Sequence, residues 1–374
     1  MVQAPADSSE TLDAHGALAL PAPPASGTRI VVDAGAAARA AWAAFLAQRA
    51  DATLFHDPLW SEIVHDVFGH RPCPLLAWRG PRLVGVLPLM EVRSLLAGRM
   101  LVSMPYATYG GALADDDETR ALLIHGAEAL ARARRARVVE LRSAHAQTLS
   151  AGWRRDERYA CFTRALPESL AALETFLPRK ARAAARQAQR RDQFHVRHDP
   201  ELLPYVWRLY ARSMRRLGSI NYPYRLFAAL RARLGPCAWV STVWDRRRPV
   251  AGVLSLVYGD TVMPYFAGAD ERVRGGGAMN LLYFAVMRRA VQAGARRFDF
   301  GRSRLGAEGA CAFKRHQGFE PRTLEYQRYS TGGGRAPDLS PDNARFGPAR
   351  AVWRRLPLGL TRPLGAWLST SIPG

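Results

Sequence analysis

The sequence has almost no lysine and few cysteines. Of its 53 lysine and arginine residues, only Lys180 and Lys314 are lysine, and the other 51 are arginine. The four cysteines are far apart and form no CxxC pair, which argues against a disulfide framework or a zinc site and favours a reducing compartment. No apolar run reaches the roughly 18 residues that a membrane span requires, and no charged-then-apolar leader opens the chain. We therefore expect a cytoplasmic protein with no bound metal.

The net charge of +21 at pH 7 suggests a polyanionic partner such as nucleic acid, anionic lipid or a phosphorylated substrate. The alternative is that arginine has replaced lysine over an ordinary solvated surface, because the chain is also crowded with Ala, Gly and Pro. Charge alone therefore identifies no partner. The hydrophobic content of 48% is typical of a globular protein, and a length of 374 residues favours two domains over one.

An internal duplication is the clearest sign of organisation. Three motifs recur in the same order: AWRGPRLVGVLPL (77–89) with VWDRRRPVAGVLSL (243–256), MPY (104–106) with MPY (263–265), and VVELRS (138–143) with RFDFGRS (297–303). A helical pattern precedes the third motif in each copy. The Gly-Val-Leu motifs are 167 residues apart and the MPY motifs 159, so we expect an extra hairpin, MEVRSLLAGRM, in the first copy.

The duplicated pattern predicts an α/β (α+β) fold with two tandem domains, each a mixed, mostly antiparallel sheet flanked by helices. Each copy should run strand–strand–strand–helix–strand after leading helices. The expected organisation is a disordered tail over 1–28, a first domain over 29–166, a basic linker helix and following strand over 167–197, a second domain over 198–330, and a C-terminal tail over 331–374.

The linker between the copies, LPRKARAAARQAQRRDQFHVR, carries six basic residues within 179–191. On a helix, residues four apart share one face, and like charges there repel unless an anion compensates them. We therefore consider a phosphate or RNA contact, with a plain solvated linker helix as the alternative. The candidate contacts are Lys180, Arg182, Arg186 and Arg190.

A glycine-rich loop precedes the helix of the second copy, in ERVRGGGAMN. Unpartnered N–H groups and the helix dipole favour an anion at such a helix start. The loop is neither GxGxxG nor a Walker loop, so it supports neither a dinucleotide fold nor an NTPase. The first copy has the acids DDDE at 115–118, which would repel an anion, so only the second copy is suited to a phosphorylated donor; a merely flexible turn is the alternative. The donor-binding candidates are Arg272, Arg274, Gly275, Gly276 and Gly277.

The order strand, Arg-x-x-Gly-x-Gly loop, helix, strand resembles the acyl-CoA-binding core of the Gcn5-related N-acetyltransferases (GNAT). Two such units in tandem, with FDFG followed by FKxxxGF, resemble the FemAB/FemABX family, whose members look like doubled acetyltransferase folds. Many of them use aminoacyl-tRNA to add amino acids to peptidoglycan precursors. Over about residues 40–370, the chain is most similar to the FemAB-like proteins of exosortase/PEP-CTERM polysaccharide gene clusters. The resemblance implies two tandem GNAT-like domains.

The resemblance also implies roles for particular residues. A Phe-Lys pair lies by the acyl donor in this family and maps onto Phe313 and Lys314. The co-substrate would be an acyl-CoA, such as acetyl-CoA, or an aminoacyl-tRNA, with no tightly bound cofactor. The muropeptide ligases carry a phosphate-holding lysine in the helix that here reads WSEIVHDVFGH, where His65 and His70 are the nearest cations. This departure weakens the case for a UDP-muramoyl acceptor.

Acyl transfer to an amine needs a neutral amine and stabilisation of the developing oxyanion. Lys314 could supply a compact charge or shuttle a proton, which arginine cannot do; a surface lysine kept by drift is the alternative. Asp299, in FDFG, could be a general base or a structural carboxylate that caps backbone N–H groups. Tyr265 is the third catalytic candidate, with a core aromatic as the alternative. The acceptor-binding candidates are Tyr106, Tyr109, Gly110 and Gly111.

Arg302, Ser303 and the C-terminal tail can each be interpreted as functional or as purely structural. Arg302 and Ser303 lie beside the donor site, but Arg-Ser also ends the first copy, which favours a structural role. The tail RAVWRRLPLGLTRPLGAWLST sets Trp353 and Trp367 among arginines. That composition suits peripheral contact with the inner membrane, and packing onto the second domain is the alternative.

The residues and the resemblance together favour an N-acyltransferase or aminoacyltransferase. Its acceptor would be an amine on a small molecule or on a cell-envelope or exopolysaccharide precursor, with the donor bound by the second domain. A non-catalytic RNA- or membrane-binding accessory protein on a degenerate double fold is the alternative. The basic linker helix leaves tRNA open as a partner, and the sequence leaves the oligomeric state open.

Overall fold

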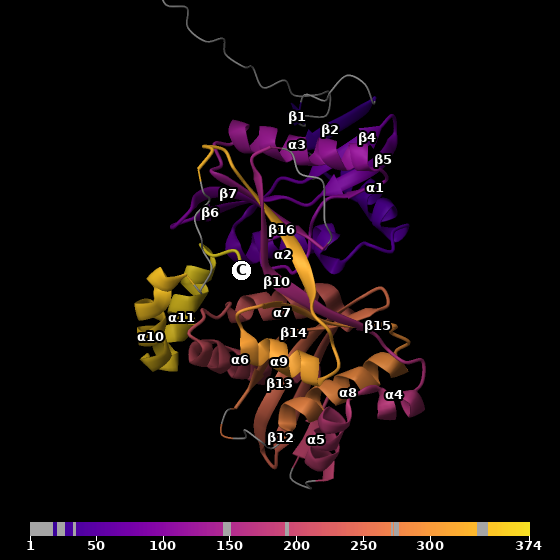
Figure 1. The fold of residues 1–374 in the computed structure, drawn as a ribbon, viewed down its shortest axis with the longest axis vertical. Coiled ribbons are helices and arrows are strands. Elements are labelled where there is room, and N and C mark those ends of the chain that lie inside the picture. Colours follow the sequence, from indigo (N-terminus) through magenta and orange to yellow (C-terminus); the bar gives the residue numbers. More distant parts are fainter. Residues whose placement is uncertain are drawn as a thin grey trace, which may run out of the picture.

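The computed structural model describes residues 18–20, 27–32, 35–144, 151–190, 194–270, 272, 277–334 and 343–374. Figure 1 shows the two halves of the chain stacked one above the other, with the last two helices at one side. The first half contains β1 (Leu18–Leu20), β2 (Thr28–Val32), α1 (Ala36–Ala47), α2 (Pro58–Phe68), β3 (Arg71–Pro72), β4 (Leu75–Arg79), β5 (Arg82–Leu87), β6 (Met90–Ser94), β7 (Gly98–Ser103), β8 (Leu113–Ala114), α3 (Asp117–Ala133), β9 (Val138–Ser143) and β10 (Trp153–Ala165).

The second half begins with the linker helix and ends with the helical tail. It contains α4 (Leu170–Phe176), α5 (Arg179–Arg190), β11 (Phe194–Arg197), α6 (Leu203–Leu217), α7 (Tyr224–Leu234), β12 (Ala238–Asp245), β13 (Arg248–Tyr258), β14 (Thr261–Ala269), α8 (Ala278–Gln292), β15 (Arg297–Arg304), α9 (Glu308–His316), β16 (Arg322–Ser330), α10 (Gly347–Arg355) and α11 (Leu358–Ser369). The predicted strand–strand–strand–helix–strand order is therefore confirmed in β12, β13, β14, α8 and β15.

Two sheets carry the fold. One has five strands in the order β1-β2-β4-β5-β8, and the other has eleven in the order β11-β12-β13-β14-β15-β10-β16-β9-β7-β6-β3. In the larger sheet, β10 from the first half pairs with β15 of the second, and β16 from the second half pairs with β9 of the first. The two halves are thus joined by continuous strand pairing, and the predicted α/β fold with two tandem domains is confirmed with this addition.

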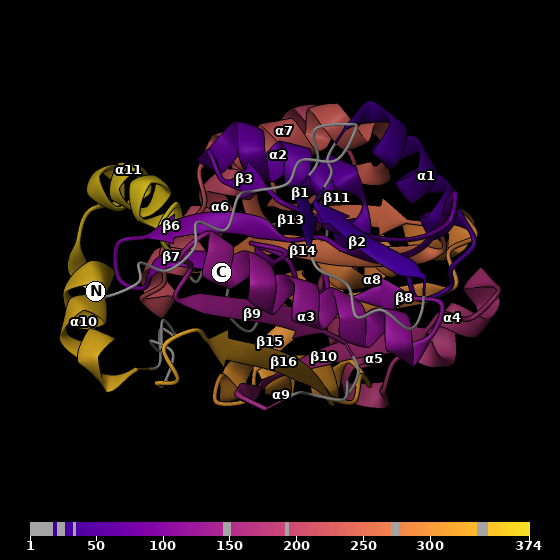
Figure 2. The same cartoon turned by 90° about the horizontal axis from the view of Figure 1, so that it is seen from above.

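Helices cover both faces of each half because the strands are apolar on both sides. In the second half, α4, α5 and α8 pack with Phe162 and Phe298 on one face, while α6 and α7 pack with Leu254 and Met263 on the other. In the first half, α3 packs with Leu101 and other strand residues, and α1 packs on the opposite face. Seen from above in Figure 2, α10 and α11 lie at the opposite side of the molecule from α4 and α5.

The expected hairpin in the first copy is present. Strands β6 and β7 pair antiparallel from Met90 with Val102 to Ser94 with Gly98, which accounts for the shorter distance between the MPY motifs. The acids at 115–118 fit the start of α3, where Asp116 is the N-cap and accepts a hydrogen bond from Thr119 N.

The ends of the chain add two features. Within the stretch predicted to be a disordered tail, residues 18–20 form β1 and pair with β2; residues 1–17 and 21–26 lie outside the described residues. The C-terminal tail forms α10 and α11, which contact α6. Among the helices that the structure describes, none is both long enough and apolar enough to cross a bilayer.

Candidate functional site

A wedge opens between two parallel strands of the second half. Strands β14 and β15 pair only at Thr261 with Arg297 and at Val262 with Phe298. Beyond these pairs the strands separate, so their facing edges carry no strand-to-strand pairing over the rest of their length. Backbone groups at such an edge can pair with another extended chain. The wedge is therefore a ready site for an extended ligand that carries amide groups.

Asp299 is the first residue of β15 beyond the paired part of the wedge. Its Oδ2 accepts a hydrogen bond from the hydroxyl of Tyr109 at 2.8 Å, and its Oδ1 accepts one from Gly301 N at 2.7 Å. The side chain is buried, and this burial raises the pKa of the carboxyl above its ordinary value. Asp299 thus caps a backbone N–H and also presents a carboxylate of increased basicity.

A cavity of about 550 Å³ lies between the two halves in front of Asp299. The first half contributes residues of the predicted acceptor group, and the second contributes the start of β14 and β15. The polar and loop residues on its lining are Asp51, Thr53, His56, Tyr109, Gly110, Gly111, Arg120, Ser143, Cys161, Thr163, Tyr258, Thr261, Arg297, Asp299 and Arg322. Because Asp299 and three arginines line one cavity, the cavity can hold an amine close to a base and also bind an anionic part of the same molecule.

A β-bulge in β15 sets the direction of Asp299. On the neighbouring strand β10, Thr163 pairs with Asp299 and Cys161 pairs with Arg302, so two residues of β15 stand opposite one of β10. The bulge includes Gly301, whose φ of +63° suits glycine. Residues 161 and 163 lie on one face of β10, because side chains alternate along a strand. The bulge therefore turns Asp299 and Arg302 to the same face.

Lys314 holds this bulge. Its Nζ donates to the carbonyl oxygens of Phe300 at 2.8 Å, Gly301 at 3.1 Å and Arg302 at 3.4 Å. Burial lowers the pKa of Lys314 to about 8. A compact ammonium with three donors fits three converging carbonyls, whereas the planar fork of arginine does not. In this arrangement Lys314 does not line the 550 Å³ cavity, and its neighbour Phe313 packs against Tyr283, with ring centroids 5.5 Å apart.

The loop that carries the predicted acceptor residues is fixed by the second half. Tyr265, the extra residue of a bulge between β13 and β14, donates from its hydroxyl to Tyr106 O at 2.5 Å. Tyr106 is 2% exposed, and its hydroxyl bonds to His70 Nε2 at 2.7 Å and donates to Ser369 O at 2.8 Å. Tyr106 therefore lies in the core, whereas Tyr109 reaches the cavity. Tyr265 bonds across the interface between the halves.

The two glycines of this loop allow a close approach to the strands behind it. A Cβ on Gly110, whose φ is +138°, would lie 2.9 Å from Met104 N, and one on Gly111 would lie 2.7 Å from Ser143 Oγ. His56 Nε2 bonds to Gly111 O at 3.1 Å, and burial lowers the pKa of His56 to about 4. His56 is thus a neutral imidazole that anchors the loop.

Of the predicted donor loop, Arg274, Gly275 and Gly276 lie outside the described residues. Gly277 is the N-cap of α8, with φ +73°, and a Cβ there would lie 2.6 Å from Ala184 O of α5. Arg272 is exposed, and its Nε lies 3.4 Å from the buried carboxylate of Asp270. The start of α8 and the basic helix α5 are therefore in direct contact.

Helix α5 lies where the sequence predicts a basic linker helix, and it buries its alanines. Ala181, Ala185 and Ala188 are buried. Arg186 pairs with Glu174 at 3.2 Å, and Arg182 Nη1 is 3.5 Å from Glu174 O. The predicted phosphate contacts Lys180 and Arg190 are exposed.

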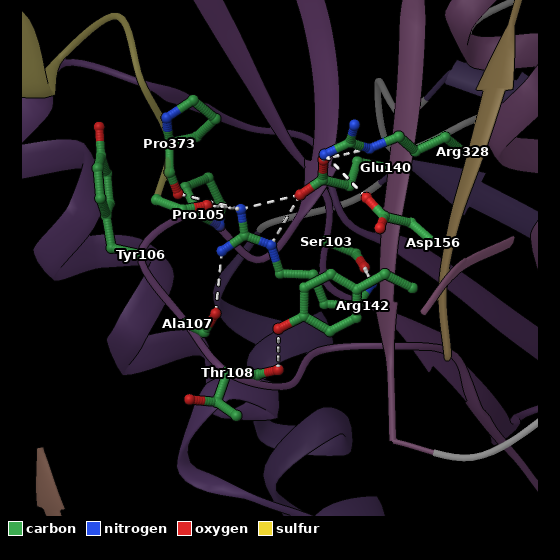
Figure 3. A network of polar contacts seen from close by, with 12 residues as sticks. Ser103, Pro105, Tyr106, Ala107, Thr108, Glu140, Arg142, Asp156, Arg328 and Pro373 are labelled. Carbon is green, nitrogen blue, oxygen red and sulfur yellow. Dashed lines mark hydrogen bonds and ion pairs between the residues drawn. The ribbon is translucent and has the colours of Figure 1, made fainter. Parts of the chain in front are cut away.

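A second cavity, of about 390 Å³, lies at the open end of the wedge. Its lining includes Tyr265 and Phe266 from β14, Gly301 and Arg302 from β15, and residues 372–374. Figure 3 shows the buried network beside it, in which the fully buried Arg142 donates to Glu140 and to the carbonyl oxygens of Ala107 and Pro373. Burial acts to raise the pKa of Glu140, but the guanidinium groups of Arg328 and Arg142 outweigh it and hold that pKa at about 2.

Sequence reasoning missed several residues of these cavities. His56 stands in FHDPLW, a stretch that carried the family resemblance without suggesting a role for the histidine. Arg302 was expected to be structural, and the structure places it on the lining of the second cavity. Residues 372–374 gave no signal, because only the fold brings them to the interface. Within the described ranges, no cluster of His, Cys, Asp or Glu could hold a metal ion.

Comparisons with known proteins agree with this architecture. Residues 176–315 match the family model of the acetyltransferase (GNAT) domain. The crystal structure of FemX is similar with a TM-score of 0.60 at 15% identity, covering 78% of this chain and 96% of that one. A tandem GNAT protein from the clavulanic acid biosynthesis pathway has a TM-score of 0.50 at 14% identity, covering 80% of this chain and 94% of its own.

A third structure of similar fold is the C-terminal domain of a putative lysylphosphatidylglycerol synthetase from Agrobacterium fabrum. Its TM-score is 0.51 at 14% identity, and it covers 80% of this chain and 99% of its own. A search of curated protein sequences gave no significant match. The second half of the chain therefore carries a GNAT acetyltransferase domain, and the chain as a whole has a FemX-like tandem fold. The similarity to exosortase-associated proteins stays a prediction.

Proposed function

We propose that this chain, a FemAB-like protein of the GNAT superfamily, is an N-acyltransferase that uses Asp299 as its general base. The observation that carries the proposal is the position of Asp299. It stands where the pairing of β14 and β15 ends, and it lines the cavity between the two halves. An acyl donor in the wedge and an amine in the cavity would meet at this residue.

The donor would lie along the separated edges of β14 and β15. An acyl-CoA fits this site, because its pantetheine arm is an extended chain with amide groups that can pair with strand edges. Its phosphates would approach the start of α8 and the exposed basic side chains of α5. An aminoacyl-tRNA is the second candidate donor, favoured by the charge of α5 and of the whole chain.

The chemical step follows from the contacts of Asp299. The amine nitrogen attacks the acyl carbonyl, so the N–C bond forms and the C–S bond of a thioester, or the C–O bond of an aminoacyl ester, breaks. The amine proton passes to the Asp299 carboxylate, whose raised pKa makes it a better base. The leaving thiolate, or the alkoxide of the aminoacyl ester, takes up the proton from Asp299, which returns the carboxyl to its ionised form. Tyr109 orients the carboxylate through its 2.8 Å hydrogen bond.

We assign Lys314 a positioning role in this reaction. Its three hydrogen bonds to the bulge of β15 fix the strand from which Asp299 projects. Backbone N–H groups along the open edge of β14 would stabilise the oxyanion, as such donors do in other acyl transfers.

The acceptor would be an amine on a molecule that also carries negative charge. Arg297 and Arg322 line the cavity that holds Asp299, so an anionic envelope or exopolysaccharide precursor suits it. The tail supports action at the inner face of the membrane, because it exposes the apolar residues Val352, Leu360, Leu364 and Trp367 among arginines.

Titration with desulfo-CoA, coenzyme A and a deacylated tRNA tests the donor site. We expect micromolar binding of coenzyme A, weakened about tenfold by Arg272→Glu, which replaces a positive charge of the predicted donor loop with a negative one. The exposed Arg315→Glu is the matched control and should bind as the parent chain does. Binding of tRNA with a steep salt dependence and no binding of coenzyme A would assign the aminoacyl-tRNA donor instead. Binding of neither would contradict the proposal.

A further inference from the structure

Helix α11 turns its large apolar side chains away from the protein. The residues that it buries, spaced one turn apart, are Thr361, Gly365 and Ser369. The large apolar residues that it exposes, spaced four and three positions apart, are Leu360, Leu364 and Trp367. This spacing places the three exposed side chains on one face of the helix. Because a helix in water normally buries its large apolar side chains, the outer face of α11 favours an apolar partner over water.

Close packing fixes α11 in this orientation. A Cβ on Gly365 would lie 2.6 Å from Asn221 Oδ1, and the amide of Asn221 donates to Arg362 O at 3.3 Å. In the preceding helix, the indole of Trp353 donates to Ser219 O at 3.0 Å. Helices α10 and α11 are thus held on the segment between α6 and α7 by glycine packing and by polar groups. The apolar face of α11 cannot turn inward without breaking these contacts.

The β6–β7 hairpin, the extra element of the first copy, exposes a second apolar group. Leu95 and Leu96 lie in the turn between its two strands and are 69% and 52% exposed. Figures 1 and 2 both show the tip of this hairpin on the side of the molecule where α10 and α11 lie. A single exposed leucine is ordinary on a soluble protein, but large apolar side chains gathered from two distant segments on one side indicate an interaction surface.

The charge around these apolar groups is positive. Residues 343–374 contain five arginines and no Asp or Glu. In the hairpin, Arg93 and Arg99 flank the tip, and the one acid, Glu91, is buried with a carboxylate oxygen 3.4 Å from Arg99 Nε. A second copy of the chain would bring like charges together, so it does not suit this side of the molecule. Exposed Trp and Leu side chains among arginines suit the surface of an anionic bilayer.

We propose that the tip of the β6–β7 hairpin and helices α10 and α11 form one docking surface for an anionic lipid bilayer. With 12 residues, α11 is about 18 Å long, which is too short to cross a hydrocarbon core of roughly 30 Å. It would lie along the interface with its apolar face among the acyl chains, while the arginines reach the lipid phosphates. The inference deepens the proposed action at the membrane by adding the hairpin to the tail, but docking itself needs no acyl transfer.

Sedimentation of the full chain with lipid vesicles, with no acyl donor present, tests the docking surface. One set of vesicles contains phosphatidylcholine with about 30% phosphatidylglycerol, and the other contains phosphatidylcholine alone. We expect about tenfold stronger binding to the anionic vesicles, and a loss of this preference as the salt concentration approaches about 1 M. Arg355→Glu, at an exposed position of α10, should weaken binding to the anionic vesicles about tenfold.

Variants of the two elements show whether they act together. We expect the double variant Leu95→Ser/Leu96→Ser at the hairpin to bind anionic vesicles about tenfold more weakly than the parent chain does. The double variant Leu364→Ser/Trp367→Ser on α11 should show a loss of similar size. Leu305→Ser is the matched control, because Leu305 is 45% exposed but lies in the loop between β15 and α9. It should bind as the parent chain does.

Three results would overturn the proposal: equal binding to both kinds of vesicle, undiminished binding by the hairpin variant, or undiminished binding by the α11 variant. A dimer that forms without lipid and that Leu364→Ser/Trp367→Ser dissociates would also overturn it, because the apolar face would then be a contact between copies. Analytical ultracentrifugation measures that dimer, and circular dichroism verifies the fold of each variant. Titration with coenzyme A should be unchanged in all of them, which separates a failure of docking from a failure of the proposed function.

Discussion

The hydroxyl of Tyr109 donates a 2.8 Å hydrogen bond to the carboxylate of Asp299, although the two residues lie 190 positions apart in the chain. One comes from a loop of the first half and the other from β15 of the second. The bond therefore needs both halves of the duplicated fold and their shared sheet. It couples the surface that would bind the acceptor to the residue that would accept its proton.

Removing the Tyr109 hydroxyl should change the pH dependence of turnover. The hydrogen bond from Tyr109 favours the ionised form of Asp299, and burial opposes ionisation. Tyr109→Phe should therefore raise the pKa of Asp299 further and move the acidic limb of the rate profile to higher pH, with about a tenfold lower rate at neutral pH. The profile of kcat against pH measures this shift. Tyr224→Phe, at an exposed tyrosine, is the control and should leave the profile unchanged. If the acidic limb of Tyr109→Phe stays at the pH of the parent chain, Tyr109 does not influence the pKa of the general base.

Lys314→Arg should weaken the fold and the activity together. Arginine cannot place three donors on the converging carbonyls of Phe300, Gly301 and Arg302, so the bulge of β15 should loosen. We expect a loss of about 2 kcal/mol in the free energy of unfolding and a fall in kcat with little change in donor affinity. Urea unfolding and steady-state kinetics measure the two effects, and Arg315→Lys is the matched control. Wild-type stability and rate in Lys314→Arg would rule out a lysine-specific role.

The lowered pKa of Lys314 predicts an unusual dependence of stability on pH. Its pKa is about 8 in the folded chain against 10.5 for the ordinary group. Between these values the unfolded chain binds more protons than the folded chain, so the contribution of Lys314 to the free energy of unfolding rises with pH. Relative to Lys314→Met, the parent chain should gain about 3 kcal/mol between pH 8 and 10.5. A constant difference across this window would contradict the buried site of Lys314.

Gly111→Ala should displace the loop that lines the first cavity. The new Cβ would lie 2.7 Å from Ser143 Oγ and 2.9 Å from Ser143 Cα, so the loop or β9 must shift. We expect a loss of about 1–3 kcal/mol in stability and a raised KM for the amine. Gly309→Ala meets no atom within 4 Å of its Cβ and lies in α9, so it should keep or slightly raise the stability and leave the KM unchanged. Thermal denaturation and acceptor kinetics provide the comparison.

The repeated architecture could be predicted because each copy is recognisable from short motifs in the sequence. Motif order and the eight-residue offset were enough for the strands, the crossover helices and the β6–β7 hairpin. The pairing of β10 with β15 and of β16 with β9 could not be predicted, because it joins segments from opposite halves. The exchange of strands between the halves is a property of the whole fold.

In the candidate site as well, local motifs could be predicted and contacts between distant segments could not. Asp299 could be singled out from its motif, but its partner Tyr109 depends on how the halves meet. Lys314 stood out as one of two lysines, yet its three carbonyl partners exist only because Gly301 opens a bulge in β15. Residues 372–374 line the second cavity only because two helices bring them back to the interface. In each case, a non-local contact supplied what the local pattern lacked.

The rate of acyl transfer by Asp299→Asn tests the central claim most directly. Release of the free thiol from acetyl-CoA in the presence of an amine acceptor measures the rate, and titration of coenzyme A measures donor binding separately. We predict about a 100-fold lower kcat in Asp299→Asn, loss of the acidic limb of its pH profile, and unchanged affinity for coenzyme A. A variant that keeps the parent rate and pH profile would contradict the assignment of Asp299 as the general base.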